Sequence, residues 1–551
     1  MSIGISPKVV IALLLLCGCL VGTDARAAVY YVKPSGTGPG TSWEEAGPLQ
    51  ATVTAAAAGD EVWVAAGTYT STQNPVLIMK TGVALYGGFA GTEASIGQRD
   101  WTANPTIIDG GNVRGCVRGA NNARLDGFTI THGKWTALGG GMSNDTVSPT
   151  VANCTFTGNT GGFGGGMYNK QATTVITDCI FSDNSSDWDG GGLYNEMSSA
   201  VISGCLFSGN ASLRRGGGMC NSAALPEVTD CIFTENTSAV SGGGMYNEES
   251  SPTVSYCRFE GNMAERGGGI YICEDSVPML FQCTLTLNVA VYSGGGIFNV
   301  TSAPTIAGCM IVENTSSTGN GGGITNSAAA LTLYNSLVVA NSAQTDGGGI
   351  YNEISSPLVM INCTVAGNMS NTAGGGGGMY NLQSEPEVTN CIFWNNSVSG
   401  GQVSNIEGTP LLQVSFSCIG GGYAGTGNID TDPLFVGASP DDYQLQAGSL
   451  CIDSGTDVNA PDEDIRGLTR PQDDGYDMGA YEFRKEIPHP ADTDENFRIV
   501  MSEAIAYLTG WQMGTNPMTN AIRAVYLWQV GEYYGYDPEE TPPMCWIPRQ
   551  P

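Results

Sequence analysis

Five residues near the C-terminal end have the types and spacing of a calcium-binding loop. Asp492, Asp494, Asn496 and Glu503 stand at positions 1, 3, 5 and 12 of a short stretch, and Arg498 at position 7 offers its backbone carbonyl. Calcium prefers oxygen ligands at this spacing, and the last glutamate binds through both carboxylate oxygens. The pattern predicts a metal site formed by these five residues, with calcium as the cofactor.

A second interpretation of the same stretch needs no metal. Phe497 stands where such a loop normally has a glycine for its sharp turn, and no second calcium loop precedes the later helix that we expect from about Thr519 to Tyr534. A first helix is expected from about Met501 to Thr509. Acidic residues near its start would cap it and interact favourably with its dipole. Both interpretations stay open.

A second group of residues could take part in acid–base chemistry on a polysaccharide. Glycoside hydrolysis needs paired carboxylates, and an eliminating lyase needs a basic residue beside bound calcium. The candidates are Asp183, Asp187 and Asp189 beside Trp188, followed one repeat later by Arg214 and Arg215. The exposed bends of an acidic repeat protein also carry scattered Asp and Arg, and no such pair recurs in neighbouring repeats. We therefore assign no catalytic residue and no further cofactor.

These residues must be held by a repeat of about 26 residues. A triplet of glycines followed by Met, Leu or Ile begins at residues 139, 164, 190, 216, 242, 267, 294, 321, 347 and 376. A second series in the same step consists of Cys154, Cys179, Cys205, Cys231, Cys257, Cys283, Cys309, Ser336, Cys363, Cys391 and Cys418. Apolar residues alternate around each cysteine, as in Val151-Cys154-Phe156, which is typical of short strands with one buried face.

An asparagine follows each member of this series from Cys154 to Cys391 after five residues, from Asn159 to Asn396. Asparagine and glycine enter the left-handed backbone region at least cost, so we expect a left-handed bend at this position. A second asparagine series follows the glycine triplets from Asn144 to Asn381 and is interrupted by Ile272. Side-chain amides stacked in such ladders can bond to one another along the stack.

Repeats of this length bury their apolar face only by stacking, which predicts an all-β, right-handed parallel β-helix solenoid with coils of about 26 residues, followed by a small α-helical C-terminal domain. Stacked cysteines lie about one strand spacing apart with parallel side chains, too far apart for a disulfide. We therefore expect ten buried free thiols in the cysteine series. Five other cysteines lie outside it: Cys116, Cys220, Cys273, Cys451 and Cys545.

The N-terminal residues predict export. Lys8 precedes an apolar run from Val9 to Val21, which suits a signal peptide and is too short for a membrane span. We place the cleavage before Ala28, with lipidation of Cys19 as the alternative. The net charge of −31 excludes nucleic acids and anionic membranes as partners and leaves neutral, cationic or calcium-bridged ones. No later stretch is apolar enough to predict a transmembrane segment.

The repeat resembles that of polymorphic outer membrane proteins and, more generally, the pectin-lyase-like superfamily. The resemblance is carried by Phe156-x-x-Asn159 and by Gly165-Gly166-Met167, which recur across roughly 270 residues. It implies the β-helix fold and leaves the function open, because these relatives include surface adhesins as well as polysaccharide lyases and hydrolases.

Both ends of the solenoid carry further resemblances. The stretch from Val29 to Tyr69 is similar to the opening segment that caps many exported β-helices. Asp432-Pro433-Leu434-Phe435, Cys451-Ile452-Asp453 and Asp477-Met478-Gly479 resemble a choice-of-anchor segment, and the calcium loop with its helices resembles half of a dockerin module. The expected domains are residues 1–27 (signal peptide), 28–105 (cap and first coils), 106–435 (repeats), 436–484 (choice-of-anchor-like segment) and 485–551 (dockerin-like module).

The sequence favours a non-catalytic bacterial protein, secreted or held at the cell surface, that serves as an adhesin-like or structural stalk. Its expected partners are an extracellular protein or polysaccharide, and the C-terminal module would dock a partner protein. The alternative function is a polysaccharide lyase or glycoside hydrolase of the pectin-lyase-like fold.

Overall fold

The computed structural model describes residues 27–409, 413–437, 442–472, 474–484, 489–491, 498–513, 515–530, 534–536 and 541–548. The expected signal peptide up to residue 26 and the expected calcium ligands Asp492, Asp494 and Asn496 lie outside these residues. The chain divides into two compact units, residues 1–232 and 233–551, which we describe one at a time. Among the described residues, no helix is both long and apolar enough to cross a membrane.

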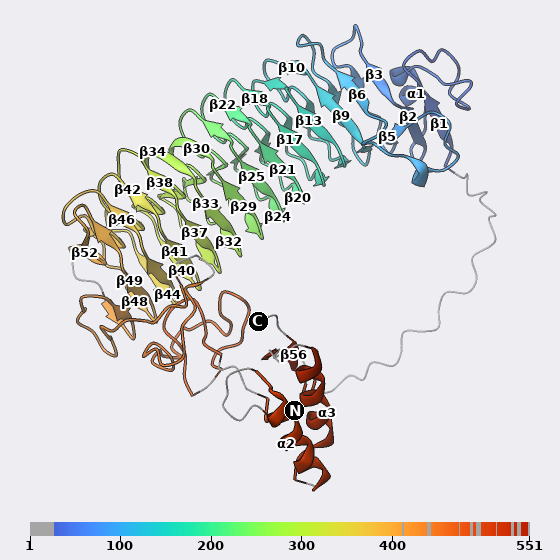
Figure 1. Cartoon of the computed structure of the whole chain (residues 1–551). Coiled ribbons are helices and arrows are strands. Elements are labelled where there is room, and N and C mark those ends of the chain that lie inside the picture. Colours follow the sequence, from blue (N-terminus) through green and yellow to red (C-terminus); the bar gives the residue numbers. More distant parts are fainter. Residues whose placement is uncertain are drawn as a thin grey trace, which may run out of the picture. The chain divides into compact units, whose positions relative to one another are not determined.

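Unit 1 is a stack of parallel strands in four sheets, which we call A, B, C and D (Figure 1). Sheet A contains β1 (Val29–Val32), β2 (Glu61–Ala65), β5 (Ala84–Phe89), β8 (Arg124–Asp126), β12 (Thr150–Ala152), β16 (Val175–Thr177), β20 (Val201–Ser203) and β24 (Glu227–Thr229). Sheet B contains β3 (Gly67–Tyr69), β6 (Thr106–Asp109), β9 (Phe128–Thr131), β13 (Thr155–Thr157), β17 (Ile180–Ser182) and β21 (Leu206–Ser208).

The other two sheets complete each coil of unit 1. Sheet D contains β10 (Lys134–Trp135), β14 (Thr160–Gly161), β18 (Ser185–Ser186) and β22 (Ala211–Ser212). Sheet C contains β4 (Leu77–Ile78), β7 (Val117–Arg118), β11 (Met142–Asp145), β15 (Met167–Lys170), β19 (Leu193–Glu196) and β23 (Met219–Ser222). From β8 onward the chain visits the sheets in the order A, B, D, C and then starts the next coil.

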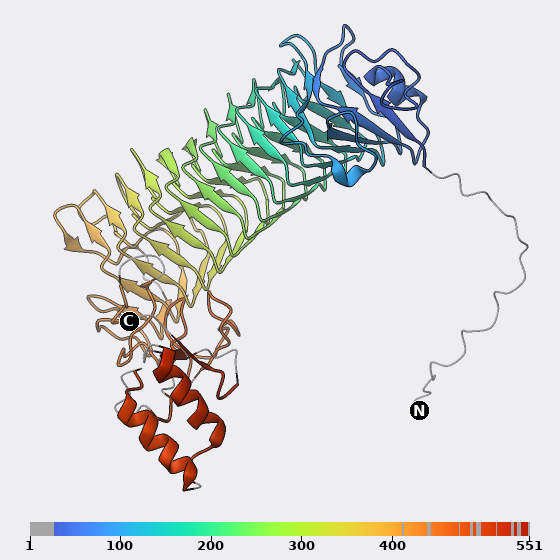
Figure 2. The same cartoon turned by 45° about the vertical axis from the view of Figure 1, so that its right-hand side comes forward.

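The N-terminal end of unit 1 carries a helix beside its first strands. Helix α1 (Leu49–Ala55) buries Leu49 and Val53 and lies at the blue end of the stack in Figure 2. A short 3-10 helix, η1, spans Ile96–Gln98. Trp43, Trp63 and Phe89 form a buried aromatic cluster near this end, in which the rings of Trp63 and Phe89 stack 4.8 Å apart. The apolar core therefore extends to the first strands.

Unit 2 repeats the same four-sheet arrangement, and β25 (Ile232–Thr234) spans the boundary between the units. Its sheet A contains β28 (Thr253–Ser255), β32 (Met279–Phe281), β36 (Thr305–Ala307), β40 (Leu331–Tyr334), β44 (Leu358–Ile361), β48 (Glu387–Thr389) and β53 (Gln413–Ser415). Its sheet B contains β29 (Arg258–Glu260), β33 (Thr284–Thr286), β37 (Met310–Val312), β41 (Leu337–Val339), β45 (Thr364–Ala366), β49 (Ile392–Trp394) and β54 (Cys418–Ile419).

Its sheet C contains β27 (Met245–Glu248), β31 (Ile270–Cys273), β35 (Ile297–Val300), β39 (Ile324–Ser327), β43 (Ile350–Glu353), β47 (Met379–Leu382) and β52 (Ile406–Thr409). Its sheet D contains β26 (Thr237–Ser238), β30 (Met263–Arg266), β34 (Val289–Ser293), β38 (Thr315–Ser316), β42 (Ser342–Ala343), β46 (Met369–Ser370), β50 (Ser397–Val398) and β51 (Gln402–Val403). The last pair, β50 and β51, is antiparallel.

The end of unit 2 is helical. Helices α2 (Met501–Gln512) and α3 (Met518–Val530) are followed by a short antiparallel pair, β55 (Tyr534–Tyr536) and β56 (Trp546–Pro548). Ile499, Ala504, Leu527 and Trp546 belong to one buried cluster of this region. The prediction of a solenoid followed by a small helical domain is therefore confirmed.

Like side chains stack inside each unit, as the repeat predicts. The rings of Phe156, Phe181 and Phe207 are fully buried, and successive centroids lie 4.9 and 4.8 Å apart. Each buried ring contributes about 1.5–3 kcal/mol of hydrophobic stabilisation. Asn159 Nδ2 donates to Asn184 Oδ1 at 2.9 Å, so the predicted amide ladder also forms. The described cysteines are all buried, as expected for the cysteine series, and no disulfide joins any of them.

The glycine triplets make bends where no side chain fits. Gly190 has a φ of +70°, and a Cβ on Gly191 or Gly192 would come within 2.4 to 2.6 Å of a backbone oxygen of the next coil. The predicted left-handed bend at the asparagines is wrong by one residue, because φ is positive at Gly158, Asp183 and their counterparts. The asparagine itself points inward, where its amide bonds to the neighbouring coils.

The predicted cysteine series is also wrong at its last member. In the register of β49 with β54, Ile392 faces Cys418, so the partner of Cys391 is Ser417. The backbone amide of Cys391 donates to Ser417 Oγ at 3.0 Å, just as that of Cys309 donates to Ser336 Oγ at 3.1 Å. The last step of the repeat is one residue shorter than the cysteine spacing suggests. Cys418 therefore takes the outward position of its strand.

Candidate functional site

A group of aromatic side chains lies where sheets D and C of unit 1 meet. Phe163 follows β14, and its ring centroid lies 5.4 Å from that of Trp188, 5.1 Å from that of Tyr194 and 6.3 Å from that of Tyr168. Tyr168 in β15 and Tyr194 in β19 stack at 5.6 Å with nearly parallel rings. We call these four residues the aromatic corner. The register of sheet C places Tyr168 opposite Tyr194. Phe163 and Trp188 lie shortly before the glycine triplets that begin at residues 164 and 190.

The outer part of the aromatic corner faces solvent. Trp188 is 49% exposed, whereas Tyr168 and Tyr194 are buried beneath it. The guanidinium of Arg214, from the next coil, lies 6.0 Å from the centre of the indole ring. An exposed indole beside a cation offers one apolar stacking face and several hydrogen-bond donors. This combination suits binding of a ring that is apolar on one face and polar at its edge.

Hydrogen bonds fix the inner part of the corner. The Tyr168 hydroxyl donates to the Glu196 carboxylate, which also pairs with Lys170 at 2.8 Å. Burial, together with this hydrogen bond, raises the pKa of Tyr168. The hydrogen bond that the Lys170 ammonium donates to Glu196 raises the pKa of Lys170. Tyr168 therefore stays neutral and Lys170 charged at neutral pH. The contacts of both residues with Glu196 hold the Tyr168 ring in place.

The acid–base candidates do not form one group. Asp183 lies in the bend between β17 and β18 with a φ of 54°, whereas Asp187 and Asp189 follow β18 at the aromatic corner. Asp189 is buried and bridges to Arg215 through its backbone. Among the described residues, no set of three ligand atoms within 4.8 Å includes any of these aspartates.

Comparisons with known proteins agree with this architecture. A family described as "Right handed beta helix region" matches residues 186–315. The fold is a right-handed parallel β-helix. A family described as "Protein of unknown function (DUF1565)" matches residues 35–203. The crystal structure of pectate lyase Pel9A aligns over 83% of this chain and 96% of its own length, with 13% identity and a TM-score of 0.33. Comparison with curated proteins finds no match.

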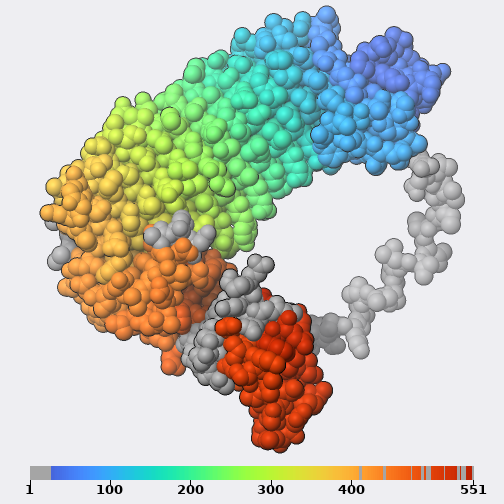
Figure 3. Space-filling model, viewed as in Figure 1, coloured from blue at the N-terminus to red at the C-terminus, as the bar shows by residue number. Residues whose placement is uncertain are grey.

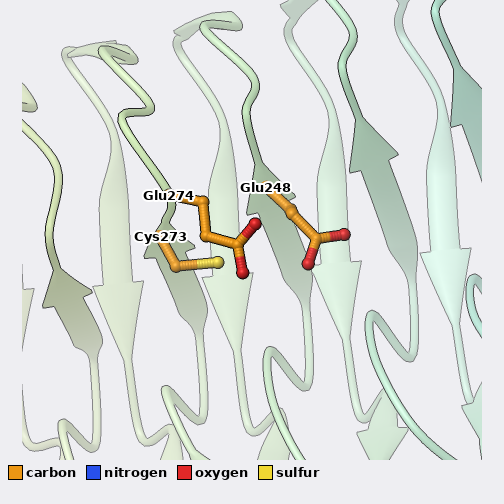
Figure 4. Close-up of side chains that lie close together, drawn as sticks. All are labelled: Glu248, Cys273 and Glu274. Atoms are coloured by element: carbon orange, nitrogen blue, oxygen red, sulfur yellow. The ribbon is translucent and has the colours of Figure 1, made fainter.

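A possible metal-ligand group lies elsewhere in the β-helix, in unit 2. Glu248 ends β27, and Cys273 and Glu274 stand one coil further on, with one ligand atom of each within 4.8 Å of the others (Figure 4). Sequence reasoning did not find this group, because its members meet only through the stacking of coils. The buried Cys273 thiol contacts the Tyr246 hydroxyl at 3.2 Å and the Asn247 carbonyl at 3.5 Å. These contacts occupy the thiol, and we assign no metal here.

Two of the five predicted calcium ligands belong to the described residues. Glu503 lies in the first turn of α2, and its Oε2 accepts the backbone amide of Val500 at 3.1 Å. This contact fits the interpretation of a capped helix. Arg498, which would offer its carbonyl, lies three residues before α2. The calcium site remains a prediction.

The outer face of sheet B in unit 2 is covered by a later part of the chain. We call residues 442–472 and 474–484 the covering segment, whose orange atoms lie against the last coils in Figure 3. Tyr443, Ile465 and Tyr481 of this segment form a buried cluster with Leu337 and Val339 of β41. The covering segment thus extends the apolar core to the outside of the β-helix.

Side-chain amides at the bends between sheets A and B fasten the covering segment. Each donates to a backbone carbonyl of the segment, and sequence reasoning missed all of them because their partners lie far along the chain. The pairs are Gln282 with Ile465 at 3.1 Å, Asn335 with Glu463 at 2.5 Å, Asn362 with Asp477 at 2.9 Å, and Asn390 with Thr456 at 2.7 Å.

A buried charge network stabilises the covering segment from within. Arg470 Nη1 pairs with Glu482 Oε2 at 2.6 Å, and both side chains are at most 1% exposed. Arg466 pairs with the buried Asp464 at 2.8 Å. Burial, with the nearby Glu482 carboxylate, raises the pKa of Asp477 to about 7. Protonation of Asp477 leaves two cations and two carboxylates in this network.

A small cavity lies between the ends of strands β45 and β49 in sheet B and the later residues Asp432, Phe435 and Tyr443. Its volume is about 290 Å³, and its walls include Trp394, Phe435 and Tyr443 with the polar groups of Asn395 and Asp432. The rings of Phe435 and Tyr443 meet edge to face at 5.1 Å. The cavity is a second place where aromatic and polar groups converge.

Proposed function

We propose that the protein is an exported, non-catalytic binding protein of the cell surface, an adhesin-like or structural stalk. The observation that supports this most is the aromatic corner, where the half-exposed Trp188 lies beside Arg214. A stacking face with adjacent donors suits a sugar ring of an extracellular polysaccharide. Of the acid–base candidates, Asp189 is buried and Asp183 lies in another bend, which favours binding over cleavage.

Export and attachment complete this proposal. The signal peptide would be removed before Ala28, or Cys19 would carry a lipid in the alternative. The covering segment closes the outer face of the last coils, so the C-terminal region is suited to join the stalk to an attachment module. In this proposal the helices α2 and α3 belong to a module that docks a partner protein.

One observation favours the alternative, a polysaccharide lyase or hydrolase. Asp187 and Asp189 flank Trp188 in the chain, and the guanidinium of Arg214 lies 6.0 Å from the centre of its indole ring. A sugar stacked on the indole would therefore lie near a carboxylate and a guanidinium. The binding experiment must for this reason also measure product formation.

The test uses the purified full chain and a panel of neutral and acidic polysaccharides, with and without calcium. We expect binding without any release of reducing or unsaturated ends. Trp188→Ala should weaken binding by about five- to tenfold, or roughly 1–1.5 kcal/mol. Tyr256→Ala is the matched control, because Tyr256 is a 57% exposed aromatic residue in unit 2. Released ends would establish the enzyme, and equal weakening by both variants would remove the aromatic corner from the proposal.

We further propose that the C-terminal module binds calcium through Asp492, Asp494, Asn496, the Arg498 carbonyl and Glu503. Calorimetric titration of the full chain with calcium tests this proposal. Glu503→Gln separates the two interpretations, because glutamine retains the cap on α2 while it removes the charge and one metal-binding oxygen. Calcium binding that is lost in Glu503→Gln supports the site. Absence of a heat change at millimolar calcium in the unaltered protein contradicts it.

A further inference from the structure

Cys418 differs from the cysteines inside the β-helix in the direction of its side chain. Ladder cysteines such as Cys363 and Cys391 are held one coil apart with parallel side chains. In that arrangement their Cβ atoms are about one strand spacing apart, beyond the ~3.5–4.5 Å that a disulfide needs. Cys418 shares the outward position of Ile392 and so leaves the ladder.

The outward side of Cys418 meets another cysteine, Cys451 of the covering segment. Both thiols are fully buried, and both belong to a cluster with Ile392, Leu445 and Met478. The Cys418 thiol also contacts the Thr431 carbonyl at 3.1 Å, at the edge of this cluster. The two thiols approach from different elements, a strand and a loop, so the restriction on parallel stacked side chains does not apply.

We propose that Cys418 and Cys451 form a disulfide that ties the covering segment to the last coil of the β-helix. The bond would close a loop between β54 and the covering segment. Such closure restricts the unfolded chain and so favours the docked segment. It would act at the end of the stalk from which the C-terminal module follows.

The reaction is a thiol–disulfide exchange with an organic disulfide, such as oxidised glutathione. The Cys418 thiolate attacks one sulfur of the oxidant and releases the first reduced thiol. The Cys451 thiolate then attacks the Cys418 sulfur of the mixed disulfide and releases the second. The protein loses two protons and two electrons, and the oxidant gains them. Because both thiols are fully buried, we expect oxidation before the segment docks or during its transient opening.

The inference relies on the proposed export only for the oxidant that the protein meets in the cell. A test with purified protein is therefore independent of export. The reduced full chain is incubated with oxidised glutathione, unfolded, alkylated and digested under non-reducing conditions. The chain has 17 cysteines, so removal of Cys17 and Cys19 leaves 15 thiols to be counted.

We expect a linked peptide pair containing Cys418 and Cys451, and 13 alkylated thiols out of 15. Cys451→Ser should abolish the linked pair, whereas the ladder variant Cys205→Ser should retain it. If either variant fails to fold, the map of the unaltered protein alone decides. Alkylation of both Cys418 and Cys451 after oxidation, or a link between two ladder cysteines instead, would overturn the proposal. Fractionation of cells tests export separately.

Discussion

The outer face of sheet B is exposed in unit 1 and covered over the later strands of unit 2, from β37 onward. In unit 1, Ile180 is 40% exposed and Ser182 and Ser208 follow in the same strands. In unit 2, the corresponding strand positions hold Leu337, Val339 and their neighbours, which are buried under the covering segment. The repeat is the same, yet the second outward residue of each strand changes from serine, at Ser182 and Ser208, to an apolar residue where another part of the chain lies on it. These apolar residues are Val312, Val339 and Ala366.

The bends beside this face differ in the same way. Unit 1 has Asp178 and Gly204 at the bend between sheets A and B, whereas unit 2 has Asn335 and Asn362. All four positions have a positive φ, so backbone conformation alone does not explain the amides. An amide offers a donor to the backbone carbonyls of the covering segment. Unit 1 has one amide at an equivalent bend, Asn153, which instead donates to Asp126 Oδ1 at 3.0 Å, so the partner of the amide differs between the two faces.

Loss of the buried ion pair between Arg470 and Glu482 should have the largest effect on the stability of the docked covering segment. Arg470→Leu leaves the Glu482 carboxylate buried without its partner, so we expect a loss of about 3–5 kcal/mol in the stability of the docked segment. Urea unfolding and limited proteolysis of the full chain measure it. The control is Arg258→Leu, which removes a half-exposed ion pair with Glu260 and should cost less than about 1 kcal/mol. Equal effects would show that burial of the charge network contributes nothing.

The apolar contact should give the next largest effect, and here the two units provide matched positions. Leu337→Ala removes a fully buried side chain beneath the covering segment and should cost about 2–4 kcal/mol. Leu206→Ala changes the equivalent, half-buried residue of β21 and should cost less than about 1 kcal/mol. Chemical denaturation of both variants is the measurement. A cost at Leu206 equal to that at Leu337 would contradict the distinction between the faces.

The side-chain amide of Asn362 should contribute less to the stability of the docked covering segment. Asn362→Gly keeps the positive φ but removes the hydrogen bonds to the carbonyls of Asp477 and Gly479, so we expect a loss of about 1–3 kcal/mol. In unit 1, Asp178→Gly is the control, because glycine already occupies the next bend at Gly204 and the change should be close to neutral. Faster proteolysis of the covering segment in Asn362→Gly alone would support the fastening role.

The sequence allowed the solenoid to be predicted because stacking repeats its constraints in every coil. The glycine triplets, the inward asparagines and the cysteines recur in almost every coil. A residue assigned wrongly in one coil therefore does not change the prediction of the fold, because the same positions in the other coils support it. Cys418 shows where this fails: a one-residue change in the last step of the repeat moved it from the inner to the outer face. A cysteine series read only from spacing cannot detect such a shift.

The candidate sites were harder to predict, because their residues meet across coils. Trp188 was interpreted beside Asp187 and Asp189, yet its ring contacts are with Phe163 and with Arg214 of the next coil. The amides that fasten the covering segment bond residues more than one hundred positions away in three of four cases, for example Gln282 with Ile465. No local pattern carries that information.

A last prediction concerns only the covered face and describes how its stability depends on pH. Asp477 has a pKa of about 7 in the folded protein and about 4 in the unfolded chain. Between these values the unfolded chain releases the proton while the folded protein retains it, so stability should fall as pH rises from about 4 to about 7 and then level off. The nearby Arg470 guanidinium lowers the pKa of Asp477, and the value of about 7 already includes this attraction.

Thermal unfolding of the full chain between pH 5 and pH 8 measures this dependence. Asp477→Asn should flatten it, although the variant loses one acceptor for the amides of Asp453 and Phe483 and is less stable at pH 5. The exposed Asp457 of the same segment gives the control variant Asp457→Asn, which should keep the slope of the unaltered protein. An unchanged slope in Asp477→Asn would mean that Asp477 stays ionised, with Arg470 compensating its burial throughout this range.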